Sequence, residues 1–132
     1  MISTVPDAVE LISIFKSGTS SGKWNVDKIS FAERLAEITR DPYLIAQGSI
    51  NLCGPASAMV AWATSDPVSF ARYSISLYET GSGFIGDLKV KAGSDLINQN
   101  YSAIRSRMTV VCPPAEWLSM SALRDSANIA LD

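Results

Sequence analysis

Two Asp-Pro pairs set helix boundaries in this 132-residue chain. The residue before a proline is disfavoured in the α-helical region, so Asp41-Pro42 is expected to end a helix over residues 28–40. Asp66-Pro67 has the opposite role, because aspartate is a good N-cap and proline fits the first helical position. The sequence therefore predicts one helix over residues 28–40 and another that starts at Pro67 and ends at Gly81.

The remaining elements are predicted from apolar spacing and from turn residues. In chain order they are a helix over residues 6–16, a flexible Gly/Ser connector over 17–23, a loop to residue 52, a helix over 53–64, strands over 84–90 and 108–112, and a final helix after Pro113-Pro114. Ser30 is expected to cap the helix over 28–40, with Glu33 as its capping-box partner. The predicted fold class is α+β, with a helical cluster followed by the beginnings of a sheet.

Composition narrows the class of protein further. The chain is 47% hydrophobic and 18% charged, so residues 1–132 are expected to form a single ordered domain or a fragment of one. With a net charge of −2 and no run of basic residues, it is not expected to bind nucleic acid or an anionic membrane. No apolar stretch is long enough for a transmembrane helix, and the N-terminus lacks a basic leader, which argues against a secretory signal peptide. The sequence does not indicate in which cellular compartment the protein acts. The cysteines and carboxylates are too scattered for a metal site, and no cofactor is expected.

The segment Gln47-Gly48-Ser49-Ile50-Asn51-Leu52-Cys53-Gly54-Pro55 carries the clearest chemical signal. Proline in a first turn places Cys53 where a helix begins, and a helix N-terminus lowers the pKa of a thiol. Gln47 lies six residues upstream, so its side-chain amide is expected to meet the Cys53 backbone amide over a shared anion site. Two such donors make an oxyanion hole. Cys53 and Gln47 are therefore the candidate catalytic residues.

The string QGSINLCGPAS resembles the segment around the active cysteine of the papain-like cysteine peptidase superfamily. Its Cys-Gly-Pro-Ala continuation is similar to papain-fold domains of bacterial effectors and toxins. The resemblance implies the helical N-terminal half and first strands of that fold, with Cys53 as nucleophile and Gln47 as oxyanion donor. It also implies a thiol hydrolase or acyltransferase of the peptidase or deamidase type, acting on a protein or peptide, in an effector that is cytoplasmic before export.

The chain contains no histidine, which such a site uses as its base. We therefore expect the chain alone to be inactive, and expect it to be a fragment or one chain of a pair. The missing C-terminal part or a partner chain would supply the histidine, and either of these or a homodimer would cover an open sheet edge.

Two alternatives stay open. Free cysteine is usually a small buried hydrophobe, so the chain could be a non-catalytic helical interaction module, or a pseudoenzyme that kept its cleft. Cys112 is expected to be such a core cysteine. Gly81-Ser82-Gly83-Phe84-Ile85-Gly86 matches GxGxxG, but it follows a predicted helix instead of a strand, so these glycines are expected to end the helix and turn the chain. Trp24, Trp62 and Trp117 are expected to be core anchors.

Overall fold

The computed structural model describes residues 3–46 and 53–131, and the side chains of all of these except residues 53–55 and 127–131. The elements are α1 (Val5–Ser17), α2 (Lys28–Arg40), the 3₁₀ helix η1 (Pro42–Leu44), α3 (Cys53–Ser65), α4 (Pro67–Thr80), β1 (Ser82–Ile85), β2 (Leu88–Lys91), α5 (Ser94–Ile97), α6 (Tyr101–Ser106) and α7 (Pro114–Leu131). The fold is α+β and rich in helix, as predicted, and within the described residues its sheet is a single antiparallel hairpin.

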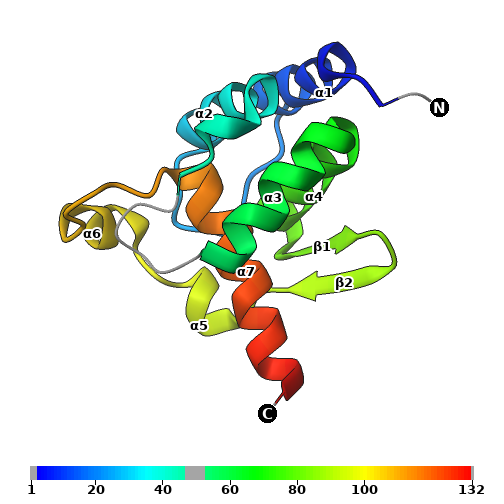
Figure 1. Ribbon diagram of the computed structural model, residues 1–132. Coiled ribbons are helices and arrows are strands. Elements are labelled where there is room, and N and C mark those ends of the chain that lie inside the picture. The colour runs from blue at the N-terminus through cyan, green and yellow to red at the C-terminus, as the bar shows by residue number, and fades with distance from the viewer. Residues whose placement is uncertain (1–2, 47–52, 132) are drawn as a thin grey trace.

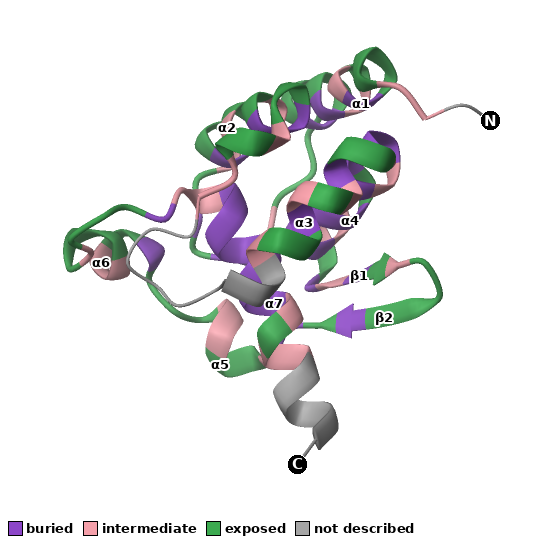
Figure 2. Cartoon of the chain, in the orientation of Figure 1, coloured by how far each residue is buried: buried purple, intermediate pink, exposed green. Residues whose placement is uncertain are grey.

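Helix α7 lies at the centre of the arrangement (Figure 1). It packs against α2, α3, α4 and β2, while α1 lies alongside α2 and also contacts α4. Residues 115–122 of α7 are all buried, and Figure 2 shows this half of the helix in purple beneath the other elements. Large, fully buried core side chains come from α7 itself and from the helices that surround it, among them Phe31, Leu35, Phe70, Tyr73, Leu77, Leu118 and Met120.

Helix boundaries follow local capping chemistry. Asp66 caps α4 by accepting a hydrogen bond from the Ser69 amide at 3.2 Å, and Gly81 ends that helix with a left-handed φ of 82°. Helix α2 spans the predicted residues, but its cap is Asp27, which accepts from the Ser30 amide at 2.9 Å. The prediction that Ser30 caps this helix was therefore wrong. Ser30 is already in the first turn, where its backbone amide needs an acceptor.

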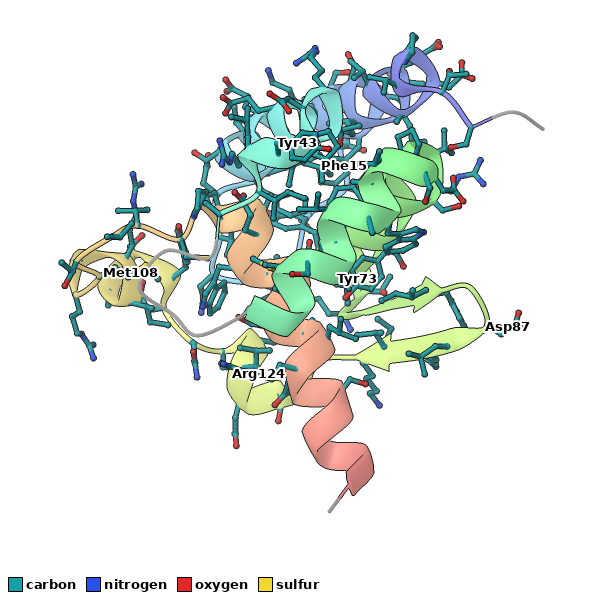
Figure 3. The ribbon with its side chains drawn as sticks, in the orientation of Figure 1. Phe15, Tyr43, Tyr73, Asp87, Met108 and Arg124 are labelled. Carbon is teal, nitrogen blue, oxygen red and sulfur yellow. The ribbon has the colours of Figure 1, made fainter. Side chains whose placement is uncertain are left out.

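The predicted strand over residues 84–90 is wrong, because these residues form the end of one strand, a turn and the start of another. Ser82 pairs with Lys91 and Ile85 with Leu88 across a turn at Gly86 and Asp87. Gly86 has φ = 61°, which glycine adopts without strain. Asp87 lies at the tip of the hairpin, away from the helices (Figure 3). Of the glycines in the GxGxxG match, Gly81 thus ends a helix and Gly86 turns the chain, as predicted, whereas Gly83 lies within β1.

The predicted strand over residues 108–112 is also wrong, since this segment is irregular. At Cys112, both backbone groups pair with side chains. The Cys112 amide donates to Met108 Sδ at 3.2 Å, and its carbonyl accepts from the Tyr101 hydroxyl at 2.6 Å. These apolar residues therefore form no ladder with any of the described strands.

The tryptophans contribute to the core as expected. Trp24 and Trp117 are buried and pack edge to face with ring centroids 5.8 Å apart. Trp24 also donates from Nε1 to the Leu77 carbonyl at 2.7 Å, which satisfies its one polar group. Trp62 is half-buried and packs against Phe70.

Candidate functional site

Helix α3 begins at Cys53, which confirms the predicted helix start and places Cys53 in its first turn. The helix packs against α4, α7 and η1. The side chain of Cys53 lies outside the described residues, as does all of Gln47. The expected approach of the Gln47 amide to Cys53 therefore stays a prediction.

An ion pair with a buried carboxylate contacts residues 44–46, which precede Gln47 in the chain. Arg34 on α2 donates from Nη2 to Glu116 Oε2 at 2.7 Å, and from Nε to both carboxylate oxygens at 3.1 Å. The Glu116 side chain is fully buried, whereas that of Arg34 is 19% exposed. Glu116 also lies in the first turn of α7, where the helix dipole favours a negative charge. The pair therefore joins the second helix to the last.

The same two side chains hold the backbone that leads toward Cys53. Arg34 Nη2 donates to the Leu44 carbonyl at 2.9 Å, and the Ala46 amide donates to Glu116 Oε2 at 3.1 Å. The Ala46 carbonyl faces the Cys112 thiol, whose Sγ lies 3.7 Å away. Ala46, the last described residue before Gln47, is thus bonded on both its amide and its carbonyl side.

Cys112 has the environment of a core cysteine, as predicted. Its side chain is fully buried, and burial together with the nearby Glu116 charge raises the pKa of its thiol to about 12. A thiol with such a pKa is protonated at neutral pH and is a poor nucleophile. Cys112 is therefore a packing residue, in contact with the Ala46 carbonyl.

Sequence reasoning missed Arg34 and Glu116. A usable signal exists for Glu116, which falls at positions i, i+3, i+4 and i+7 with Ser119, Met120 and Leu123 on the inward stripe of α7. A charged residue on such a stripe indicates a buried partner, because an unpaired charge would be costly there. No local pattern identifies that partner as Arg34, 82 residues earlier.

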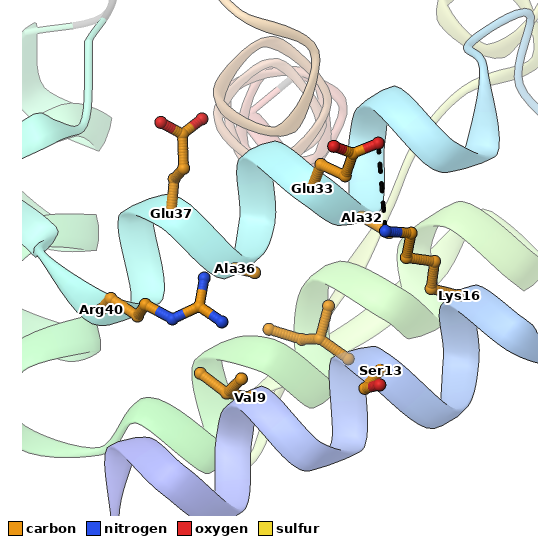
Figure 4. Close-up of a pocket in the computed structure, with 9 residues that line it drawn as sticks. Val9, Ser13, Lys16, Ala32, Glu33, Ala36, Glu37 and Arg40 are labelled. Atoms are coloured by element: carbon orange, nitrogen blue, oxygen red, sulfur yellow. Dashed lines mark ion pairs between the residues drawn. The ribbon is translucent and has the colours of Figure 1, made fainter.

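A groove lies between α1 and α2 (Figure 4). Its floor includes Ala32 and Ala36, and Lys16 pairs with Glu33 across it at 4.0 Å. Both partners of that pair are exposed, so the interaction contributes little stability. Ser13 and Lys16 line this groove, but no cysteine does. Among the residues that the structure describes, no group of three or more metal-ligating side chains comes together, and no helix is long and apolar enough to cross a membrane.

Comparisons of the chain with models of protein families, with curated proteins and with solved structures found no match.

Proposed function

We propose that this chain carries the nucleophile-bearing part of a papain-like thiol hydrolase, with Cys53 as nucleophile and Gln47 as oxyanion donor. The observation that supports this most is the start of α3 at Cys53, because unpaired amides at a helix N-terminus favour the thiolate. The resemblance around Cys53 supports peptidase or deamidase chemistry in a bacterial effector or toxin. A helix start alone would be weak support without the Gln47 spacing and the Gly54-Pro55 step.

In the proposed reaction, the Cys53 thiolate attacks the carbonyl carbon of a protein or peptide amide. The carbonyl oxygen becomes an oxyanion, to which the Cys53 backbone amide and the Gln47 side chain donate hydrogen bonds. The C–N bond then breaks, and the amine leaves with the proton that the base took from the thiol. Water hydrolyses the resulting thioester, which releases the carboxylic acid and the thiol. The substrate's carbonyl carbon, not a cofactor, is the electrophile.

A base must take the thiol proton and return it to the leaving amine. No histidine is present in the sequence, so we propose that the imidazole comes from further polypeptide or from a partner chain. The same partner, or a second copy of this chain, is proposed to cover the hairpin edge. By itself, this chain is expected to give no useful turnover of peptide or amide substrates. Robust turnover that Cys53→Ala abolishes would show that the chain has a base of its own.

The test is the pH dependence of thiol alkylation. Iodoacetamide is added to the folded chain over a pH series, and each cysteine is followed separately by peptide mass spectrometry. We expect Cys53 to react with a midpoint below about 8.5, the value of an ordinary thiol, while Cys112 stays unreacted because its pKa is about 12. Unfolding in urea is the control and should make the two cysteines equally reactive.

The alternative is a non-catalytic interaction module in which Cys53 is a core residue. That function predicts that Cys53 resists alkylation in the folded chain as Cys112 does. An unreactive Cys53 would therefore refute the thiol hydrolase and favour the module. A pseudoenzyme that kept its cleft predicts a reactive Cys53 and no turnover even after a histidine-bearing partner is added.

A further inference from the structure

A cavity of about 430 Å³ lies between the start of α2 and α6. Its walls come from three segments that are far apart in the sequence, within residues 25–30, 101–106 and 111–114. A volume of this size falls in the range of about 300–1,000 Å³ that is typical of small-molecule sites. We propose that the cavity binds a free α-amino acid with an aliphatic side chain, whose carboxylate pairs with Arg105 and whose ammonium group pairs with Asp27. This inference does not depend on the proposed function of Cys53.

The walls of the cavity are held together by the protein itself. The Asn25 backbone forms a bridge with that of Asn100, and Asn25 Nδ2 donates to the Asn98 carbonyl at 3.2 Å. The Tyr101 hydroxyl donates to the Cys112 carbonyl at 2.6 Å, which ties α6 to the segment that leads into α7. Because these bonds already order the walls, a ligand needs to supply little free energy for that purpose.

Two opposite charges line the cavity without pairing with each other. Asp27 caps α2, and hydrogen bonds from the Ser30 amide and hydroxyl lower the pKa of its carboxyl, so Asp27 is ionised at neutral pH. Arg105 is a permanent cation, and it forms no ion pair with any carboxylate in the described part of the chain. Both side chains belong to exposed residues, so a single ion pair with either would be weak. A zwitterion can pair with both at once, and an α-amino acid is the smallest ligand that carries the two charges.

The rest of the lining favours an aliphatic side chain on this ligand. Val26 and Tyr101 are buried, and together with Val111 and Pro114 they supply the apolar surface of the cavity. The hydroxyl of Tyr101 is already bonded, so its ring contributes apolar surface. A third charge on the ligand would find no partner on this surface. Leucine, valine and methionine therefore fit the lining better than acidic or basic amino acids do.

The two charges can be removed one at a time, on the protein and on the ligand. Asparagine is as good an N-cap as aspartate, so Asp27→Asn removes the charge and should leave the start of α2 intact. Arg105→Gln removes the other charge. The matched controls are Asp87→Asn, at the tip of the hairpin, and Arg107→Gln, because neither residue lines the cavity. L-leucine is the probe, N-acetyl-L-leucine lacks the ammonium group, and L-leucinamide lacks the carboxylate.

The experiment is isothermal titration calorimetry of the whole chain with each probe, together with an NMR titration that follows the Ser30 and Ser102 amides. We expect L-leucine to bind with a millimolar or lower Kd and to shift both amides. Asp27→Asn, Arg105→Gln and each of the two leucine derivatives should weaken binding about tenfold or more, the scale of one lost hydrogen bond to a charged group. The control variants should bind L-leucine as the wild type does.

The simpler alternative is that the cavity is a surface depression that holds only water. The absence of saturable binding of L-leucine, L-valine and L-methionine at millimolar concentrations would overturn the inference in favour of that alternative. Binding that the Asp27 and Arg105 variants leave unchanged would also overturn it. If N-acetyl-L-leucine bound as tightly as L-leucine, the ligand would be a simple carboxylate and the zwitterion would be wrong. If a variant does not fold, the derivative that lacks the matching charge tests the same pair on the wild type.

Discussion

Removal of Arg34 should cost more stability than neutralisation of Glu116, although the two side chains form one ion pair. Arg34→Met leaves a fully buried carboxylate whose one remaining donor among the described contacts is the Ala46 amide. Breaking a buried pair in this way typically costs about 3–5 kcal/mol. We therefore expect a loss of that size in the free energy of unfolding.

Glu116→Gln has a smaller expected cost because of what it leaves behind. Arg34 remains partly exposed to water, still bonded to the Leu44 carbonyl, and 3.6 Å from Glu37 on its own helix. The expected loss is about 1–3 kcal/mol, the range for an imperfectly satisfied polar group. In the double variant Arg34→Met/Glu116→Gln no buried charge remains unpaired, so the two costs should not add. The expected coupling is about 1–3 kcal/mol.

The assay is urea-induced unfolding of the four proteins of this cycle, followed by far-UV circular dichroism. Equal slopes of unfolding free energy against urea would show that the variants differ in stability and not in the extent of unfolding. If Arg34→Met costs less than Glu116→Gln, or if the two costs simply add, then the argument from a buried charge left without its partner is refuted.

Two further predictions concern local features. Hydrogen bonds from Ser3 and from Ser69 in the first turn of α4 lower the pKa of Asp66 below 3.8. The contribution of the Asp66 charge to stability is therefore present above that pH and is lost as the pH falls through the lowered pKa. Asp66→Asn should therefore cost about 0.3–1 kcal/mol at pH 7, and this difference from the wild type should shrink below about pH 4 in urea titrations. A Cβ at Gly22 would clash with the ring of Tyr78. That ring stacks on the ring of Phe31, with the two centroids 4.7 Å apart. Gly22→Ala should thus cost about 1–3 kcal/mol in thermal unfolding, and a cost near zero would show that the ring moves aside freely.

The long helices α1 to α4 and α7 were predictable because turn and cap residues that mark helix ends act locally. Asp66-Pro67 at the start of α4 and Gly81 at its end act within one turn of the chain. The misassigned strands depended on information that local patterns lack. The segment 84–90 matches a single strand unless the turn at Gly86 and Asp87 is recognised. The segment 108–112 has strand-like residues, but none of the described strands pairs with it.

Part of the candidate site was likewise predictable from the local sequence, and part was not. The position of Cys53 at a helix start was predictable from Pro55, two residues on. The Arg34–Glu116 pair was not, because each side chain lies on an amphipathic helix and only tertiary packing brings the two helices together. Cys112 was correctly expected to be buried, but its approach to the Ala46 carbonyl follows from the path of two irregular segments.

The 82-residue separation of Arg34 and Glu116 also orders events during synthesis. A chain is made from its N-terminus, so α2 and the start of α3 leave the ribosome before α7 exists. Closing a loop of this length is entropically unfavourable until the contacts of α7 compensate for it. Leu44 and Ala46 consequently gain their bonds to this pair only when the last helix packs. A nascent chain that ends before Pro114 would therefore lack the bonds that hold Leu44 and Ala46, so residues 44–46 reach their final contacts no earlier than the last helix packs.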